Sequence, residues 1–190
     1  DLMSAIGMLG TAQNMYNQPL LPAPYASEWY QKQGIKYLSI DLNGENNSLK
    51  IDLSKPLVNG FITNAFVSSN LCDMLVDCGT SEHIRGIDDK FSWEAIYNCW
   101  KTKHDLLKIG GVMYSENPKT GNWPLHGQNY YTISFYLELK AMTDYEIIDI
   151  GEHPACGNFV DGWNIFCSMR KRSEKFPSLK EFKKLPLYEK

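Results

Sequence analysis

Apolar and polar positions follow one another in blocks along residues 73–115, and these blocks predict a strand, a helix and a second strand. The apolar run at 73–78 ends abruptly in small and polar residues. Ser92 fits an N-cap, and apolar side chains follow it at three- and four-residue spacing as far as Gly110. A further apolar run at 112–115 predicts the second strand. Such a unit indicates a parallel sheet, which usually binds its ligands at the carboxyl ends of the strands.

The same pattern of apolar and polar positions predicts the other helices and strands of the chain. Helices are expected at 26–33, at 133–142 and, as a short element, at 61–70. Further strands are expected at 3–9, 35–40, 49–53, 145–150 and 164–169. Only a loop joins the last two strands, so we expect them to be antiparallel neighbours. About seven strands, with helices between the first five, predict an α/β sandwich.

Charge is unevenly distributed along the 190 residues, which carry a net charge of −3. From Arg170 onward, eight Lys or Arg and three Glu give +5, which leaves −8 for the preceding 169 residues. We therefore expect one domain over residues 1–172 and a basic tail at 173–190. Such a tail can touch nucleic acid or anionic lipid but is more often simply solvated. The acidic body disfavours nucleic acid as a partner.

Five cysteines occur without a closely spaced pair. This pattern indicates reduced thiols in a cytoplasmic compartment, and no ligand spacing predicts a zinc site, so no metal is expected. No apolar run approaches the roughly 20 residues that span a bilayer, and no signal peptide is present. The sequence opens at Asp1 within an apolar segment, so we expect a few residues to precede it.

Four polar stretches carry a resemblance to a known family. They are Ser39–Gly44, Asp77–His83, Leu107–Gly111 and Gly121–Gly127. Together with the order of elements, they resemble the class I S-adenosylmethionine-dependent methyltransferases, with their Rossmann-like fold, and a small branch of that superfamily. The resemblance covers residues 4–172. It implies S-adenosylmethionine as cofactor and a three-layer α/β sandwich, with a seven-stranded, mostly parallel sheet closed by an antiparallel hairpin.

The resemblance also implies a cofactor site at the ends of the first four strands. The loop after the first strand would wrap the methionine part of the cofactor with Gly10, Thr11 and Gln13. Asp41, which ends the second strand, would accept hydrogen bonds from both ribose hydroxyls, although it also fits a turn before an Asn-Gly pair. The ends of the next two strands would contact the adenine and the transferred methyl group through Asp52, Leu53, Cys78 and Gly79.

Glu82 and His83 would face the methyl acceptor and are the candidate catalytic residues. A hydroxyl or protonated amine needs a base, and His83 suits this role because the ordinary pKa of histidine is about 6.5. Alternatively, Thr80 or Ser81 caps a helical turn, and Glu82 and His83 are merely exposed.

An aromatic cluster follows the fifth strand, on the same predicted edge. Its flat rings with polar tips could bind a ring-bearing or cationic acceptor, or could instead pin the loop onto the core; they are Trp123, His126, Tyr130 and Tyr131. His153, after the sixth strand, could close the pocket. His104 lies on the apolar face of the long helix and reads as a core histidine.

The resemblance implies methyl transfer to a small-molecule acceptor by in-line SN2 displacement. The site at 77–83 lacks the Asn-Pro-Pro-Tyr pattern of enzymes that methylate amino groups of nucleic acids. The alternative is a non-catalytic relative that acts as a binding or partner subunit, which the sparse glycines of the first loop favour. A nicotinamide-dependent reductase is disfavoured because that loop lacks the GxGxxG pattern.

Overall fold

The structure is a computed structural model. It describes residues 26–45, 48–57, 61–62, 65–66, 70–124, 126–154 and 162–189. The strand expected at 3–9 and the loop with Gly10, Thr11 and Gln13 lie outside the described residues. The chain divides into two compact units. The N-terminal unit comprises Asp1–Ile51 and Cys156–Val160, and the main unit comprises Asp52–Ala155 and Asp161–Lys190.

In the N-terminal unit, the described part contains one helix and one pair of short strands. Helix α2 (Ala26–Lys32) confirms the helix expected at 26–33. Strand β1 (Ile40–Asp41) pairs in parallel with β2 (Leu49–Lys50). Both strands are much shorter than the apolar pattern indicated, and residues 35–38 are exposed. Their apolar side chains therefore gain little from burial.

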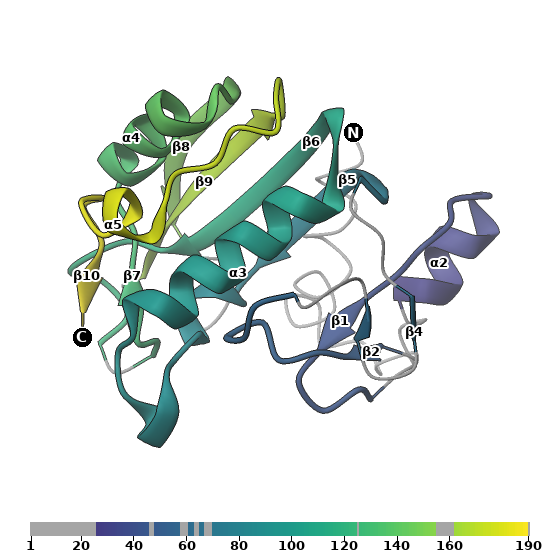
Figure 1. The fold of residues 1–190 in the computed structure, drawn as a ribbon, viewed down its shortest axis with the longest axis horizontal. Helices are drawn as coiled ribbons and strands as arrows, with labels where there is room; N and C mark the ends of the chain where they lie inside the picture. Colours follow the sequence, from purple (N-terminus) through teal and green to yellow (C-terminus); the bar gives the residue numbers. More distant parts are fainter. Residues whose placement is uncertain are drawn as a thin grey trace. The chain divides into compact units, whose positions relative to one another are not determined.

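A four-stranded mixed sheet organises the main unit (Figure 1). Its order is β5-β6-β9-β8, with bounds Cys72–Cys78, Leu107–Pro118, Trp163–Arg170 and Glu146–Pro154. The β5–β6 pair is parallel, whereas β9 is antiparallel to both of its neighbours. The antiparallel pairing expected for the last two predicted strands is thus confirmed, and β9 lies between β6 and β8.

The prediction of one seven-stranded, mostly parallel sheet is wrong. In the described residues, the other strands form separate two-stranded sheets, namely β1 with β2, β3 (Phe61–Ile62) with β4 (Ala65–Phe66), and β7 (Asn129–Tyr130) with β10 (Tyr188–Glu189). The short helix expected at 61–70 is also wrong, because β3 and β4 pair antiparallel there. An apolar run indicates that a segment is buried or extended. The strand with which it pairs is determined by contacts between residues that are distant in sequence.

Helix α3 (Trp93–Leu106) begins as predicted, with the Ser92 hydroxyl accepting a hydrogen bond from the Ala95 amide. It ends at Leu106, four residues before Gly110, and strand β6 follows without a loop. Gly110 instead lies in an irregular part of β6 with φ of +86°, a conformation that glycine adopts readily. Glycine therefore marks a distortion of the strand here rather than the end of the helix.

The core lies on one face of the four-stranded sheet, against α3, α4 (Ile133–Thr143) and the short α5 (Leu179–Phe182). Alternate residues of the sheet face these helices, as the pairs Met113–Met169 and Ser115–Cys167 show. The aromatic centre of the core is formed by Trp100, Tyr131, Phe135, Tyr136 and Phe182. Within the described ranges, no helix has the length and apolar character needed to cross a membrane.

The segment expected to be a solvated basic tail packs onto this core. Ser178 and Glu181 form a reciprocal capping box that begins α5, and Phe182 is fully buried. Strand β10 then pairs with β7. Lys171 is also buried, and its ammonium donates hydrogen bonds to the carbonyls of His104 and Leu107.

His104 is buried on α3, as expected for a core histidine, and Nδ1 lies 2.9 Å from the Tyr145 hydroxyl. Burial and the nearby Lys171 ammonium lower its pKa to about 4. A histidine whose pKa is lower in the folded than in the unfolded chain contributes fully to stability above its ordinary pKa. This contribution is lost as the pH falls toward the folded-state pKa, because protonation then favours the unfolded chain. The contribution of His104 should therefore decline by up to about 3 kcal/mol between pH 6.5 and pH 4.

The check is urea unfolding at pH 7 and at pH 4.5 for the wild type and for His104→Gln. The variant should lose less stability on acidification than the wild type, because every other group titrates in both proteins. If the wild type and His104→Gln lost the same stability on acidification, His104 would not be a source of the acid sensitivity.

Candidate active site

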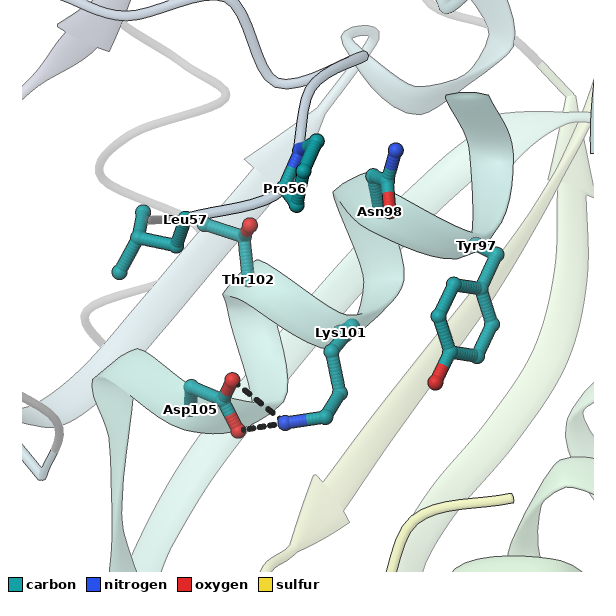
Figure 2. A pocket seen from close by; sticks show the side chains of 7 residues that line it. All are labelled: Pro56, Leu57, Tyr97, Asn98, Lys101, Thr102 and Asp105. Atoms are coloured by element: carbon teal, nitrogen blue, oxygen red, sulfur yellow. Dashed lines mark hydrogen bonds and ion pairs between the residues drawn. The ribbon is translucent and has the colours of Figure 1, made fainter. Parts of the chain in front are cut away.

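Among the described residues of the main unit, two of the cavities are similar in size. One, of about 280 Å³, adjoins α3 (Figure 2) and is lined by Pro56, Leu57, Tyr97, Asn98, Lys101, Thr102 and Asp105. Lys101 and Asp105 form an ion pair of 2.6 Å along the helix, and the Asn98 amide donates to the Ser54 carbonyl. Because its charged side chains satisfy each other, this cavity is a poor candidate for catalysis.

The other cavity, of about 260 Å³, opens at the carboxyl ends of the parallel strands β5 and β6. Cys78 and Glu116 are paired at these two strand ends. The residues lining the cavity are Cys78, Gly79, Glu82, Glu116, Asn117, Pro118, Trp123, His126 and Asn164. This is the edge that the strand–helix–strand pattern predicted for the site.

A tight turn after β5 brings Glu82 to this cavity. Gly79 adopts φ of +75°, and its amide donates to the Glu116 carbonyl at 3.1 Å. One turn of 3₁₀-helix, η1 (Ser81–His83), follows. Thr80 makes no side-chain cap, and Glu82 is only 1% exposed, whereas the His83 side chain is half exposed. Glu82 is therefore directed inward rather than toward solvent.

Beneath the turn lies a buried ion pair between Asp77 and Lys103. The Lys103 ammonium lies 2.7 Å from Asp77 Oδ2 and donates to Ser81 Oγ, also at 2.7 Å. Burial alone would raise the pKa of Asp77, but Lys103 and the hydrogen bonds from Ser81 outweigh it and hold that pKa below its usual range. These contacts fix the end of β5 and the start of η1.

The surroundings of Glu82 disfavour the charged form of its carboxyl group. Burial, together with the nearby carboxylates of Asp77 and Glu116, raises the pKa of Glu82 to about 7. Its Oε2 atom is buried and has no hydrogen-bond partner among the described residues. A buried carboxyl group that changes protonation near neutral pH is a common feature of catalytic and binding sites.

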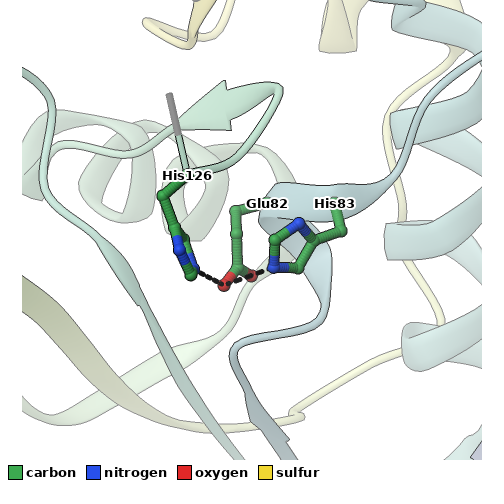
Figure 3. Close-up of side chains that lie close together, drawn as sticks. All are labelled: Glu82, His83 and His126. Carbon is green, nitrogen blue, oxygen red and sulfur yellow. Dashed lines mark ion pairs between the residues drawn. The ribbon is translucent and has the colours of Figure 1, made fainter. Parts of the chain in front are cut away.

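Two imidazoles flank this carboxyl group (Figure 3). Nε2 of His83 lies 3.6 Å from Glu82 Oε1, and Nε2 of His126 lies 3.7 Å from the same oxygen. The two ring centroids are 4.9 Å apart. Partial burial lowers the pKa of His83, and the neighbouring His126 and Arg85 act in the same direction. The structure thus brings together three predicted site residues from two separate loops.

Backbone contacts hold the second loop against Glu82. A Cβ atom on Gly127 would lie 3.0 Å from Glu82 Cβ, Cγ and backbone oxygen, so glycine permits this close approach. The Gln128 amide donates to the Glu82 carbonyl at 2.7 Å. Asn129 Nδ2 donates to the Ser81 and Ile84 carbonyls on either side. The approach of His126 to Glu82 is therefore fixed by the backbone.

The aromatic cluster divides between the cavity and the core. Trp123 and His126 line the cavity. Tyr130 and Tyr131 are buried, and neither lines the cavity. The Tyr130 hydroxyl donates to the Trp123 carbonyl, and the Trp100 indole donates to the Tyr131 hydroxyl. The two tyrosines therefore hold the loop in place, while the tryptophan and the histidine face the space that a ligand would occupy.

Glu116 is a site residue that sequence reasoning missed. Its Oε1 accepts a hydrogen bond from Asn164 Nδ2 at 2.8 Å and lies 3.2 Å from His153 Nε2, and the Tyr114 hydroxyl donates to its other oxygen. Asn117 and Asn164, which also line the cavity, were likewise not predicted. Glu116 directly follows the strand predicted at 112–115, and this position at the carboxyl edge could have identified it.

No protein-family model and no curated protein matches the sequence. Among solved structures, the chain is similar to Burkholderia thailandensis 1,6-didemethyltoxoflavin-N1-methyltransferase, crystallised with 1,6-didemethyltoxoflavin and S-adenosylhomocysteine. The sequences are 13% identical, and the TM-score is 0.52. The match covers 77% of this chain and 66% of that protein, just under two thirds of its length. The chain therefore shares its fold with that enzyme.

The described residues that the resemblance assigned to the cofactor differ in their surroundings. Asp41 ends β1 in the N-terminal unit and is exposed, and its Oδ1 accepts the Asn43 amide, as in the turn considered above. Asp52 begins a turn of the main unit that also contains Leu53, and Cys78 and Gly79 line the cavity. Burial and nearby carboxylates raise the pKa of Cys78 to about 12, so its thiol stays neutral.

Proposed function

We propose that this protein transfers a methyl group from S-adenosylmethionine to a small molecule bound in the cavity between β5 and β6. The observation that carries the proposal is the buried carboxyl group of Glu82, held beside two imidazoles at the carboxyl edge of the parallel strand pair. The methyltransferase fold supports it, and the similar Burkholderia enzyme was crystallised with both S-adenosylhomocysteine and a small acceptor molecule.

The chemistry of the proposed cofactor residues fits such a ligand. Asp41 offers an exposed carboxylate at a strand end, which can accept hydrogen bonds from two ribose hydroxyls. Gly79 lacks a side chain, so its backbone and the adjacent Cys78 can border the path of the methyl group. Asp52 and Leu53 would contact the adenine, and the methionine part would be wrapped by Gly10, Thr11 and Gln13.

In an in-line displacement, the acceptor's lone pair forms a bond to the methyl carbon while the carbon–sulfur bond breaks, and the electron pair of that bond stays on sulfur. An acceptor nitrogen or oxygen that carries hydrogen must then lose a proton. Glu82, which lies 3.6 Å from His83, would take this proton, and His83 would pass it to solvent. Trp123 and His126 would hold the acceptor, since correct alignment lowers the barrier by several kcal/mol.

The first test is a thermal-unfolding scan with and without S-adenosylhomocysteine. A ligand at about 100 times its dissociation constant stabilises the folded state by roughly 2.7 kcal/mol. For a chain of this size, the expected rise in unfolding temperature is about 5–10 °C. NAD should produce no rise. The absence of a shift at millimolar S-adenosylhomocysteine would remove the proposed function and favour a non-catalytic relative.

Asp41→Ala is expected to weaken S-adenosylhomocysteine binding by at least about tenfold, because one lost hydrogen bond to a charged group is worth roughly 1.5–3 kcal/mol. Isothermal titration calorimetry measures this change. The control is Asp73→Ala, since Asp73 is an exposed carboxylate near the amino end of β5 and pairs only with the surface residue Lys108 in the described residues. Unchanged affinity in Asp41→Ala would remove the ribose assignment.

A further inference from the structure

We propose that Glu82, His83 and His126 form a binding site for a divalent transition-metal ion. One ligand atom from each of these side chains lies within 4.8 Å of the others. The sequence pattern predicts no metal site here, because His126 lies more than forty residues beyond the Glu82–His83 pair. The folded chain brings the three together at the mouth of the β5–β6 cavity, which Glu82 and His126 also line.

The distances suit a shared ion. Zinc binds imidazole nitrogen at about 2.0–2.1 Å and carboxylate oxygen at about 2.0–2.2 Å, so two ligands of a tetrahedral ion lie roughly 3.3–3.5 Å apart. The separations between Glu82 Oε1 and the two Nε2 atoms are 3.6 and 3.7 Å. All three ligand atoms lie within 4.8 Å of one another, so rotation of the partly exposed imidazole rings could bring their nitrogens to a shared ion.

The donor set indicates the class of metal. Two imidazoles and one carboxylate suit Zn²⁺, Fe²⁺ and related ions, whereas Mg²⁺ and Ca²⁺ prefer ligand sets made entirely of oxygen. Three protein ligands also leave at least one coordination position open, which is typical of catalytic rather than structural sites. That position would face the cavity and could accept a nitrogen or oxygen atom of a bound molecule.

The buried state of Glu82 provides a second, independent observation. Its side chain is 1% exposed, and Oε2 has no hydrogen-bond partner in the part of the chain that is described. An ionised carboxylate without compensation is costly in such a place. The Lys103 ammonium, which acts on Glu82 electrostatically, instead pairs with Asp77 and donates a hydrogen bond to Ser81. A metal ion would supply the missing positive charge.

The two loops that carry the proposed ligands are also held together without a bound ion. Gly127 lets the second loop touch Glu82, and hydrogen bonds from Gln128 and Asn129 to backbone carbonyls fix the two loops together. Such pre-organisation keeps His126 near Glu82 before any ion arrives. The proposal rests on this geometry and does not require methyl transfer. With an ion in place, a bound acceptor hydroxyl or amine would lose its proton more easily, because a metal ion lowers the pKa of its ligands.

The test is metal binding by the full chain, freed of any tag and treated with a chelator that is then removed by dialysis. Calorimetric titration with zinc chloride should show one ion per chain, and cobalt(II) chloride should produce visible absorption bands of a low-coordinate site. Glu82→Gln and His126→Ala should each weaken zinc binding by at least about tenfold. Glu152→Gln removes a carboxylate that pairs with Lys119 and does not line the cavity, and its zinc affinity should match the wild type.

The absence of zinc and cobalt binding by the wild type would overturn the proposal, and so would equal affinity in Glu82→Gln and His126→Ala. Circular dichroism confirms that each variant is folded, and the wild-type cobalt spectrum does not depend on any variant. The same metal-free protein is then scanned with S-adenosylhomocysteine. A thermal shift without zinc binding removes the metal site alone, whereas zinc binding without a shift removes the proposed methyl transfer alone.

Discussion

Lys103→Met is expected to lower the free energy of unfolding by about 3–5 kcal/mol, the usual cost of breaking a buried ion pair. The substitution leaves Asp77 without its 2.7 Å partner, in a place where that carboxylate is 5% exposed. Methionine matches the length of lysine, so the loss would come from the uncompensated charge rather than from a cavity. It also removes the ammonium that lies 3.3 Å from the centroid of the Trp100 ring. Urea unfolding monitored by circular dichroism measures the change.

Lys101→Met provides a matched control on the same helix. Lys101 pairs with Asp105 four residues later, and both side chains are partly exposed. Such a pair contributes only about 0.3–0.5 kcal/mol, so this variant should unfold close to the wild type. The double variant Asp77→Asn with Lys103→Met should recover a large part of the loss, because neither partner of the former ion pair then carries a charge. A Lys103→Met protein within about 1 kcal/mol of the wild type would show that Asp77 is not held ionised by Lys103.

The local elements of the main unit were largely predictable, because each one is encoded in a short stretch. The Ser92 cap begins α3, and α4 and the strands β8 and β9 occupy the predicted positions with small differences at their ends. The prediction of a single large sheet failed because it assumed that every apolar run joins the same ladder. The run at 35–40 instead is mostly exposed, and only its last residue enters a strand. Pairing depends on partners far along the chain, which apolar periodicity does not encode.

Charge counting was misleading for the C-terminal segment. The many lysines suggested a solvated end, but Phe182, Leu185 and Leu187 are buried among them. Lys171 is buried as well, because its ammonium binds the carbonyls at the end of α3. A positive charge at a helix C-terminus is favourable, so this lysine stabilises the junction between α3 and β6. Net charge alone could not reveal which lysines face water.

For the candidate site, the sequence predicted the edge but not the pairing of side chains. Strand ends followed by polar loops located Glu82, His83 and the loop with His126. Their convergence on one oxygen atom depends on Gly127 and on backbone hydrogen bonds between the loops. Trp123 and Tyr130 belong to the same chemical class, yet one lines the cavity and the other is buried. Composition cannot separate these two roles.

Glu82→Gln is expected to lower the rate of methyl transfer by about 10²–10⁴-fold, the range associated with loss of a positioned acid or base. Glutamine keeps the size and shape of the side chain but can neither accept a proton nor supply a negative charge. The rate is measured with methyl-labelled S-adenosylmethionine and an acceptor found by screening small molecules with the wild type. Affinity for S-adenosylhomocysteine should stay within about twofold, because Glu82 acts on the acceptor side of the cavity; this would place the effect in the transfer step.

Glu152→Gln is the matched control, since Glu152 lies on β8, pairs with Lys119 and does not line the cavity. Its rate should equal that of the wild type. A Glu82→Gln enzyme that keeps a third or more of the wild-type rate would exclude Glu82 from the reaction. Repeating the wild-type assay after chelation separates the two roles argued for this side chain. If chelation leaves the rate unchanged, Glu82 acts by accepting the proton itself; if the rate falls and zinc restores it, Glu82 acts as a ligand of the ion that activates the acceptor.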